Sequence, residues 1–215
     1  MKKAVLFDLD GTLANTLPDL AHATNAALQE NGFSACPFDA YPHMVGDGAR
    51  VLIERALGNA VSPENIERVL TTFLRIYDRD CLREVRLYPG IADAVNALKQ
   101  AGYHLLVVTN KPQQQADKIV RHFFGDDVFE GVYGGSSAYP KKPDPTSVRM
   151  ALEQAGVSPE NAWFVGDSDV DVLTAKAAGL RCVGVAWGFR GEQELRHTGA
   201  NEVAASAAEL LHYIF

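Results

Sequence analysis

The chain has 215 residues, 47% of them hydrophobic, and its 27 acidic residues outnumber its 20 lysines and arginines, which gives a net charge of −7. This length suffices to bury one large core, or one core with a sizeable insertion, and the apolar fraction argues against a disordered chain. The scattered basic residues argue against a nucleic-acid partner, because binding to a phosphate backbone requires clustered lysine and arginine.

The start of the chain does not resemble an export signal. Its first apolar run, at 4–7, ends at Asp8 and is too short for the apolar region of a signal peptide, which has about 7–15 residues. No stretch approaches the roughly 18 consecutive apolar residues that cross a membrane. We therefore expect a cytoplasmic protein that does not bind a membrane, with reduced thiols at its three cysteines, Cys36, Cys81 and Cys182.

The apolar run at 4–7 predicts a first strand, and a long helical stretch follows it. From about residue 14 to residue 87 there is no convincing strand, and apolar residues recur at helical spacing. This helical segment is too long for a connection between two strands of one sheet, so we predict an all-helical cap inserted at 14–87. Its three clearest apolar stripes are 17–28, 51–57 and 66–77.

Strands and helices alternate in the remainder of the chain. Helical patterns at 91–98 and 148–155 each stop before a glycine, and they separate apolar runs of strand length. Because these runs are apolar throughout, we expect strands that are covered on both faces, as in a parallel sheet. The predicted fold class is α/β, with a doubly wound, Rossmann-like parallel sheet formed by 1–13 and 88–215. The strand runs are 105–108, 163–165 and 182–185, with a weaker candidate at 132–133.

Polar residues follow three of the predicted strands. The carboxyl ends of parallel strands lie on one edge of the sheet, which is where open α/β sheets bind ligands. We therefore expect these polar residues to converge on one site. They are Asp8-Leu9-Asp10-Gly11-Thr12, Thr109-Asn110-Lys111 and Gly166-Asp167-Ser168-Asp169-Val170-Asp171.

The carboxylates of this group favour a magnesium site. Asp8 and Asp10 are two residues apart in an extended segment and share a face, where they repel unless a cation or a shared proton relieves them. Asp167 brings a third carboxylate from another strand, and hard oxygen ligands in this number suit Mg²⁺. The six histidines are dispersed without metal-ligand spacing, which argues against zinc.

Four segments resemble the motifs of the haloacid dehalogenase superfamily and occur in the family's order over nearly the whole chain. Finer features resemble its phosphoglycolate phosphatase-like branch, which has a helical cap after the first motif. The dehalogenases of the superfamily lack the second aspartate of that motif, so Asp10 favours phosphate chemistry. The four segments are Asp8-Leu9-Asp10-Gly11-Thr12, Thr109, Lys142-Pro143 and Gly166-Asp167 through Asp171; the finer features are Thr109-Asn110-Lys111-Pro112 and Val45-Gly46-Asp47-Gly48-Ala49.

The resemblance implies a Mg²⁺-dependent phosphomonoester hydrolase that acts through an aspartyl-phosphate. Asp8 would be the nucleophile, and Asp10 would protonate the leaving alkoxide and then activate water. Mg²⁺ would bind the Asp8 carboxylate, the Asp10 backbone carbonyl and Asp167. The transferring phosphoryl group would be held by Thr109, the Asn110 backbone and Lys142. The supporting residues would be Gly11, Thr12, Ser168 and Asp171, the last of which would orient Lys142 or the waters on the metal.

The helical cap would close over a small phosphorylated metabolite that resembles 2-phosphoglycolate. The candidates to meet the end of the substrate without phosphate are His43, Gly46 and Arg50, and Arg50 could pair bidentately with a substrate carboxylate. We expect a monomer or a weak homodimer, without a nucleic-acid partner.

Three other functions remain open from the sequence. A sugar phosphomutase resembling β-phosphoglucomutase would use the same first motif and return the phosphate to the sugar. An inorganic pyrophosphatase of the same superfamily would cleave a diphosphate. A receiver-type signalling domain also gathers acids, a threonine and a lysine at one sheet edge, but such a domain is much shorter and has no helical insertion.

Overall fold

The computed structural model describes residues 2–215, which form a central sheet of six parallel strands. The strand order β5-β4-β1-β6-β7-β8 places β1 in the middle of the sheet. Each predicted strand run lies within one of these strands, and the predicted doubly wound α/β class is confirmed. The strands are β1 (Ala4–Phe7), β4 (His104–Pro112), β5 (Gly131–Gly135), β6 (Ala162–Gly166), β7 (Arg181–Val185) and β8 (Glu202–Ala204).

Helices cover both faces of the sheet, as the apolar strands require. Val5 and Phe7 of β1 belong to the core on one face, whereas Ala4 and Leu6 belong to the core on the other, because successive residues of a strand point to opposite faces. The first face is covered by α5 (Ile91–Gln100), α6 (Gln113–Phe124) and α10 (Ala207–Ile214), and the second by α7 (Thr146–Ala155), α8 (Asp169–Ala178) and α9 (Glu192–Thr198).

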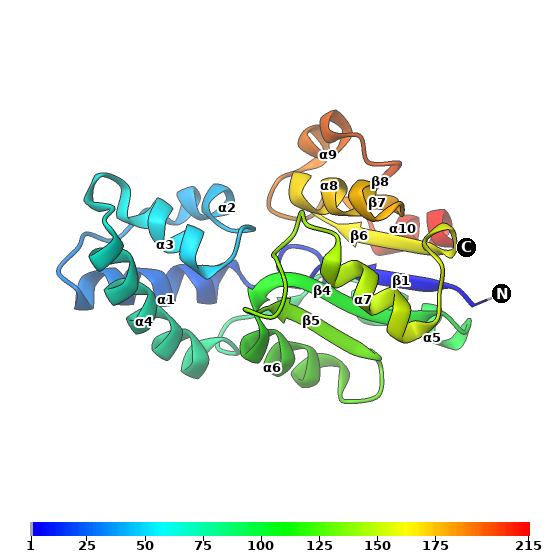
Figure 1. Cartoon of the computed structure of the whole chain (residues 1–215), viewed down its shortest axis with the longest axis horizontal. Coiled ribbons are helices and arrows are strands. Elements are labelled where there is room, and N and C mark those ends of the chain that lie inside the picture. The colour runs from blue at the N-terminus through cyan, green and yellow to red at the C-terminus, as the bar shows by residue number, and fades with distance from the viewer. Residues whose placement is uncertain (1) are drawn as a thin grey trace.

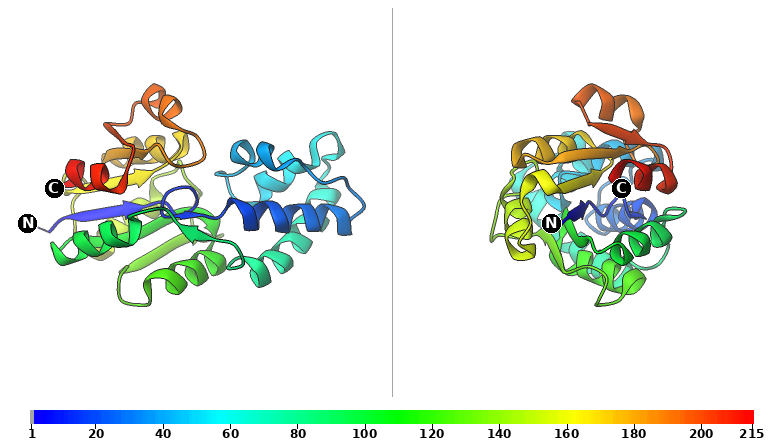
Figure 2. Two further views of the ribbon diagram at one scale, coloured as in Figure 1. Left: turned by 180° about the vertical axis from the view of Figure 1, so that it is seen from behind. Right: turned by 90° about the vertical axis from the view of Figure 1, so that its right-hand side faces the viewer.

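The remaining helices form a lobe of their own beside the carboxyl ends of the strands (Figure 1). We call α1 to α4 the helical lobe. The end-on view in Figure 2 shows this lobe behind the sheet along the long axis of the molecule. The stripe at 66–77 lies in a helix that begins after Ser62, whose hydroxyl accepts a hydrogen bond from Asn65 N at 3.1 Å. The helices are α1 (Leu17–Glu30), α2 (Tyr41–Met44), α3 (Ala49–Leu57) and α4 (Pro63–Asp80).

Two details of the predicted strand pattern are wrong. The sequence analysis found no strand from 14 to 87, yet β2 (Ala14–Asn15) and β3 (Arg86–Leu87) pair antiparallel where the chain enters and leaves the helical lobe. It also missed β8, which has three residues and begins with the exposed Glu202. Elements of two or three residues are too short to show a hydrophobic period. The predicted cap boundaries at 13/14 and 87/88 lie beside β2 and β3.

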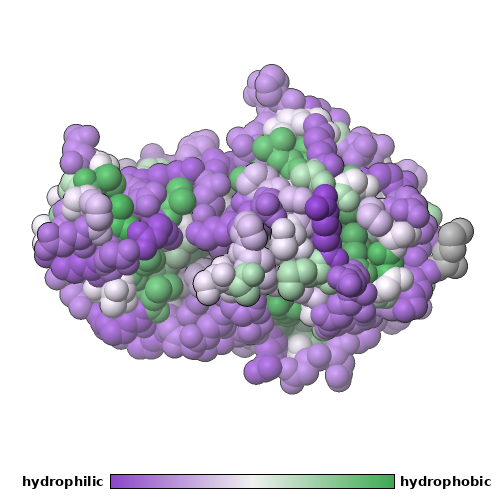
Figure 3. Space-filling model, viewed as in Figure 1, coloured by the Kyte–Doolittle hydropathy of each residue, from purple (hydrophilic) through white to green (hydrophobic). Residues whose placement is uncertain are grey.

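The surface carries no sign of a membrane span. Within residues 2–215, no helix combines the length and the apolar composition that a bilayer crossing needs. On the face drawn in Figure 3, hydrophilic residues predominate and the hydrophobic ones are divided among separate small areas.

A buried carboxylate ties the two ends of the helical lobe together. Asp19 of α1 has no exposed surface, and its oxygens accept the backbone N–H of Glu84 at 2.9 Å and 3.1 Å and that of Val85 at 3.0 Å. Burial raises the pKa of Asp19, although these donors oppose the shift. Hydrogen bonds to a charged acceptor are stronger than those between neutral groups. The contacts of Asp19 with Glu84 and Val85, which we call the Asp19 clasp, therefore fix α1 against the segment that leads into β3.

Replacement of Asp19 by alanine is expected to lower the free energy of unfolding by about 2–4 kcal/mol, because it leaves buried N–H groups without acceptors and opens a small cavity. Urea unfolding followed by circular dichroism measures this loss. The matched control is Asp39→Ala at an exposed position, where a change within about 0.5 kcal/mol is expected. Equal losses in both variants would show that the clasp contributes nothing.

Candidate active site

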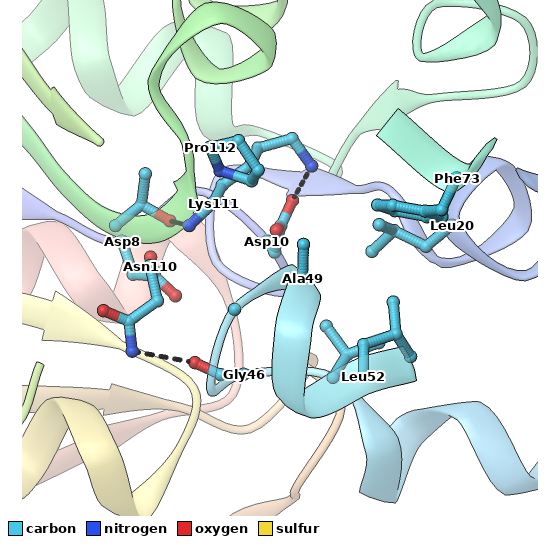
Figure 4. A pocket seen from close by; sticks show the side chains of 13 residues that line it. Asp8, Asp10, Leu20, Gly46, Ala49, Leu52, Phe73, Asn110, Lys111 and Pro112 are labelled. Atoms are coloured by element: carbon cyan, nitrogen blue, oxygen red, sulfur yellow. Dashed lines mark hydrogen bonds and ion pairs between the residues drawn. The ribbon is translucent and has the colours of Figure 1, made fainter. Parts of the chain in front are cut away.

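The polar residues Asp8, Asp10, Thr109, Asn110 and Lys111, which follow two of the predicted strands, line a pocket between the sheet and the helical lobe. Asp167 and Asp171, which follow a third strand, lie outside its lining but close to Asp8. In Figure 4, Asp8 and Asn110 lie on one side of this pocket, Asp10 and Lys111 lie near its middle, and apolar side chains of the helical lobe face them. The sheet edge therefore supplies the polar wall and the helical lobe supplies the apolar wall. The residues of the apolar wall are Leu20, Val45, Ala49, Leu52 and Phe73, together with the glycines Gly46 and Gly48.

A buried ammonium lies beside the first aspartate. Lys142 precedes α7, and its Nζ lies 2.9 Å from Asp8 Oδ1 and 2.7 Å from Asp171 Oδ1. Burial alone would lower the pKa of Lys142, but the two carboxylates outweigh it and raise that pKa above its ordinary value. Burial also raises the pKa of Asp8 from 3.8 to about 6, although the Lys142 charge opposes this shift. At neutral pH, Asp8 is therefore mainly ionised and paired.

Asp171 orients its neighbours through hydrogen bonds to both of its oxygens. Its Oδ1 accepts from Lys142, and its Oδ2 accepts from the backbone N of Asp167 and of Ser168, both at 3.1 Å, and from Ser168 Oγ at 2.8 Å. These contacts cap the N-terminus of α8. Asp171 thus holds the ammonium and the start of the helix in one arrangement.

The third carboxylate of the cluster has no cationic partner. Asp167 Oδ2 accepts the backbone N–H of Phe189 at 2.7 Å. Burial raises the pKa of Asp167 well above 3.8, and the charges of Asp171 and Asp8 add to this shift. Two glycines leave room for this side chain: a Cβ would lie 2.2 Å from Asp167 Oδ2 if placed on Gly11, whose φ is +82°, and 2.2 Å from Asp167 Cβ if placed on Gly188.

The cluster fits a small divalent cation. Asp8, Asp167 and Asp171 each offer a carboxylate oxygen within 4.8 Å of the others, and the Lys142 ammonium pairs with only two of them, Asp8 and Asp171. An all-oxygen donor set of this kind suits Mg²⁺. Asp171 accepts the most hydrogen bonds of the three, so Asp8 and Asp167 are the better candidates to bind the ion.

The second aspartate of the first motif lies in a separate hydrogen-bonded group. Asp10 Oδ1 accepts from Lys111 Nζ at 2.8 Å and from Thr16 Oγ1 at 2.6 Å. The Lys111 side chain is fully buried and also donates to the hydroxyl of Tyr77, on α4 of the helical lobe. The sequence analysis quoted Lys111 beside Asn110 without giving it a role, and it assigned Tyr77 to the helical core.

The second motif connects three parts of the pocket. The Asn110 side chain donates to Gly46 O at 3.0 Å and to Lys142 O at 3.1 Å, and its Oδ1 accepts from Lys142 N at 2.8 Å. Thr109 is buried on the pocket wall. Because the side-chain amide of Asn110 is engaged with Gly46 and Lys142, only the backbone of Asn110 remains to bind a ligand. Thr12, from the first motif, is buried, and its carbonyl accepts from Trp187 Nε1 at 3.1 Å.

The structure separates the three candidate substrate contacts in the helical lobe. Gly46 lines the pocket, but His43 and Arg50 are exposed, and neither is among the residues that line it. Arg50 pairs with Glu67 on the neighbouring helix. His43 Nδ1 lies 3.3 Å from the Arg190 guanidinium, which also donates to a backbone carbonyl of the helical lobe. Arg190 was missed because nothing in its local sequence marks it as a contact to the lobe.

Asp167→Asn is expected to stabilise the metal-free protein. Because folding raises the pKa of Asp167 above 3.8, the folded state binds this proton more tightly than the unfolded chain, and the corresponding stability is lost as the pH rises past the raised pKa. A neutral amide removes that loss and still accepts from Phe189. We expect Tm at about pH 8, in a chelator, to rise by about 2–4 °C or more, and the difference to shrink towards acidic pH.

Differential scanning fluorimetry over this pH range measures the effect, with Asp169→Asn, which lies outside the cluster, as the control. A Tm for Asp167→Asn that equals or falls below that of the parent at about pH 8 would contradict the raised pKa of Asp167.

Comparisons with known proteins agree with this geometry. The family model of the haloacid dehalogenase-like hydrolases matches residues 5–185. A phosphoglycolate phosphatase of Colwellia psychrerythraea is 36% identical over 216 residues, which cover 98% of this chain and 96% of that protein. One of Pseudomonas putida is 36% identical over 194 residues, which cover 88% and 71%.

Solved structures show the same fold over the full length. A protein of Lactobacillus delbrueckii assigned as a phosphoglycolate phosphatase superposes with a TM-score of 0.94 at 29% identity and covers 100% of this chain and 99% of its own. CbbY of Rhodobacter sphaeroides, solved in complex with phosphate, has a TM-score of 0.82 at 31% identity, with 98% and 96% covered. These comparisons confirm the predicted resemblance and the predicted phosphatase class. The chain belongs to the haloacid dehalogenase-like hydrolases.

Proposed function

We propose that this protein hydrolyses a small phosphate monoester through an aspartyl-phosphate on Asp8. The observation that carries this proposal is a carboxylate at the floor of the pocket that is buried, paired with Lys142 at 2.9 Å and mainly ionised at neutral pH. A carboxylate held in this way is a suitable nucleophile towards a phosphoryl group.

The residues around Asp8 have complementary roles in this reaction. An Asp8 oxygen attacks phosphorus, and the bond from phosphorus to the alcohol oxygen breaks. Asp10 gives its proton to that oxygen and then accepts one from the water that hydrolyses the aspartyl-phosphate. Thr109 and the Asn110 backbone hold the phosphoryl oxygens, and Lys142 stabilises the charge that they carry in the transition state.

The acidic cluster supports Mg²⁺ as the cofactor. Asp8, Asp167 and the backbone carbonyl of Asp10 would hold the ion. When bound, the ion neutralises negative charge on the nucleophile and on the phosphoryl oxygens, so that they can approach each other. Asp171, with both oxygens engaged, holds Lys142 beside them.

The substrate is proposed to be 2-phosphoglycolate or a close analogue. The relatives from Colwellia psychrerythraea and Pseudomonas putida are phosphoglycolate phosphatases, and side chains of the helical lobe form one wall of the pocket. We propose that residues 14–87 act as a cap that excludes bulk water while the aspartyl-phosphate is present. We also propose that the enzyme is soluble and acts on this metabolite in the cytoplasm.

Asp8→Asn is expected to reduce phosphate release by about 10³-fold or more, because the amide is not a nucleophile. The assay measures free phosphate from 2-phosphoglycolate with Mg²⁺ present, and an unchanged circular dichroism spectrum shows that the variant is folded. Asp169→Asn, at an aspartate of the segment 166–171 that lies outside the acidic cluster, serves as the matched control and should retain activity. Turnover by the Asp8 variant at the parent rate would refute the nucleophile assignment.

Removal of Mg²⁺ with a chelator is expected to abolish phosphate release, and its return should restore activity. A panel of 2-phosphoglycolate, pyrophosphate, nucleotides and sugar phosphates identifies the substrate by kcat/KM. A hydrolase releases free phosphate in an amount equal to the ester consumed, whereas a phosphomutase converts a sugar phosphate without release. Full activity in the chelator would rule out a metal-dependent reaction.

A further inference from the structure

Lys111 is the only cationic side chain on the pocket wall within the described residues, 2–215. It lies on β4, two residues after Thr109, and both residues line the same pocket. One short molecule can therefore contact both positions.

The Lys111 ammonium is held in place but keeps bonding capacity. It donates to Asp10 Oδ1 at 2.8 Å and to the Tyr77 hydroxyl, and it lies 4.7 Å from the centre of the Tyr77 ring. Two of its three N–H donors are thereby used, and the third is free. An ammonium with an unused donor on the wall of a pocket is a suitable partner for an anion of the substrate.

The opposite wall offers no charged side chain for such an anion. The side chains that the helical lobe contributes to the pocket are all apolar. Arg50 pairs with Glu67, and Arg55 pairs with Asp47 at 2.6 Å. A carboxylate placed against these apolar side chains would lose its hydration without a countercharge.

We propose that Lys111, positioned by Tyr77, binds a carboxylate on the alcohol part of the substrate and thereby selects phosphate monoesters of small hydroxy acids. The assignment rests on the proposed function, and it moves recognition of the carboxylate from Arg50 to Lys111. The substrate class follows from the presence of Thr109 and Lys111 on the wall of one pocket, where a small ester can present its phosphate to Thr109 and its carboxylate to Lys111.

Lys111→Met tests the proposal by comparison of 2-phosphoglycolate with ethyl phosphate, which has a methyl group in place of the carboxylate. We expect kcat/KM for 2-phosphoglycolate to fall by roughly 10- to 150-fold, the factor for one lost charge-assisted hydrogen bond, and the ratio between the two esters to collapse. Lys118→Met is the matched control, because Lys118 also pairs with an aspartate of the helical lobe, Asp78, but outside the pocket. An equal loss for both esters in Lys111→Met would overturn the proposal.

Tyr77→Phe tests the positioning role. It is expected to raise KM for 2-phosphoglycolate by about 3- to 10-fold while KM for ethyl phosphate stays constant, because the hydroxyl acts through the ammonium. Tyr41→Phe is the control: Tyr41 is also a fully buried tyrosine of the helical lobe, and its hydroxyl donates to Asn25 at 2.8 Å. The same KM change in both variants, or for both esters, would contradict a role through Lys111.

Binding to the Asp8→Asn protein separates this inference from the proposed function. Calorimetry with 2-phosphoglycolate and with ethyl phosphate requires no turnover. If the parent releases no phosphate from any ester, the proposed hydrolysis fails. The subsite is still supported if the double variant Asp8→Asn/Lys111→Met binds 2-phosphoglycolate more weakly than Asp8→Asn does, while both bind ethyl phosphate equally. Equal binding of 2-phosphoglycolate with and without Lys111 refutes it.

Discussion

The arrangement of the sheet edge depends on one buried ammonium. Without Lys142, the carboxylates of Asp8 and Asp171 would lie together in the interior with no countercharge, which is strongly unfavourable. Asp171 in turn accepts the backbone N–H groups at the start of α8 and beside Asp167. One ammonium therefore connects the end of β1, the loop before α7 and the first turn of α8, three segments that are distant in the sequence.

The sheet and the residues at its edge could be predicted because both depend on short segments of sequence, namely apolar runs and the polar residues that directly follow them. Continuous apolar runs predicted the buried parallel strands, and the residues directly after β1, β4 and β6 lie where strand polarity requires. The errors concern elements too short to show a period, namely β2, β3 and β8. The convergence of Asp8, Thr109 and Asp167 followed from topology alone, because parallel strands end on one side.

Contacts between distant elements could not be predicted in this way. Lys111 and Tyr77 are separated by 34 positions and meet only because α4 packs over the end of β4. Arg50 has the chemistry to bind a carboxylate, but the rotation of α3 places it beside Glu67 and away from the pocket. Spacing along a helix defines faces relative to one another, whereas the direction of each face depends on tertiary packing, as the contacts of Arg190 also illustrate.

The apolar wall of the pocket has a consequence for how this fold diversifies. The groups proposed to break the ester bond belong to the sheet edge, where Lys142 connects Asp8 and Asp171 through ion pairs. The wall formed by Leu20, Ala49, Leu52 and Phe73 carries no charge and takes no part in that network. Exchanges there reshape the space for the leaving alcohol at the cost of a few methyl groups of packing. The fit to the leaving alcohol can therefore change at this wall while the charged groups of the sheet edge stay as they are.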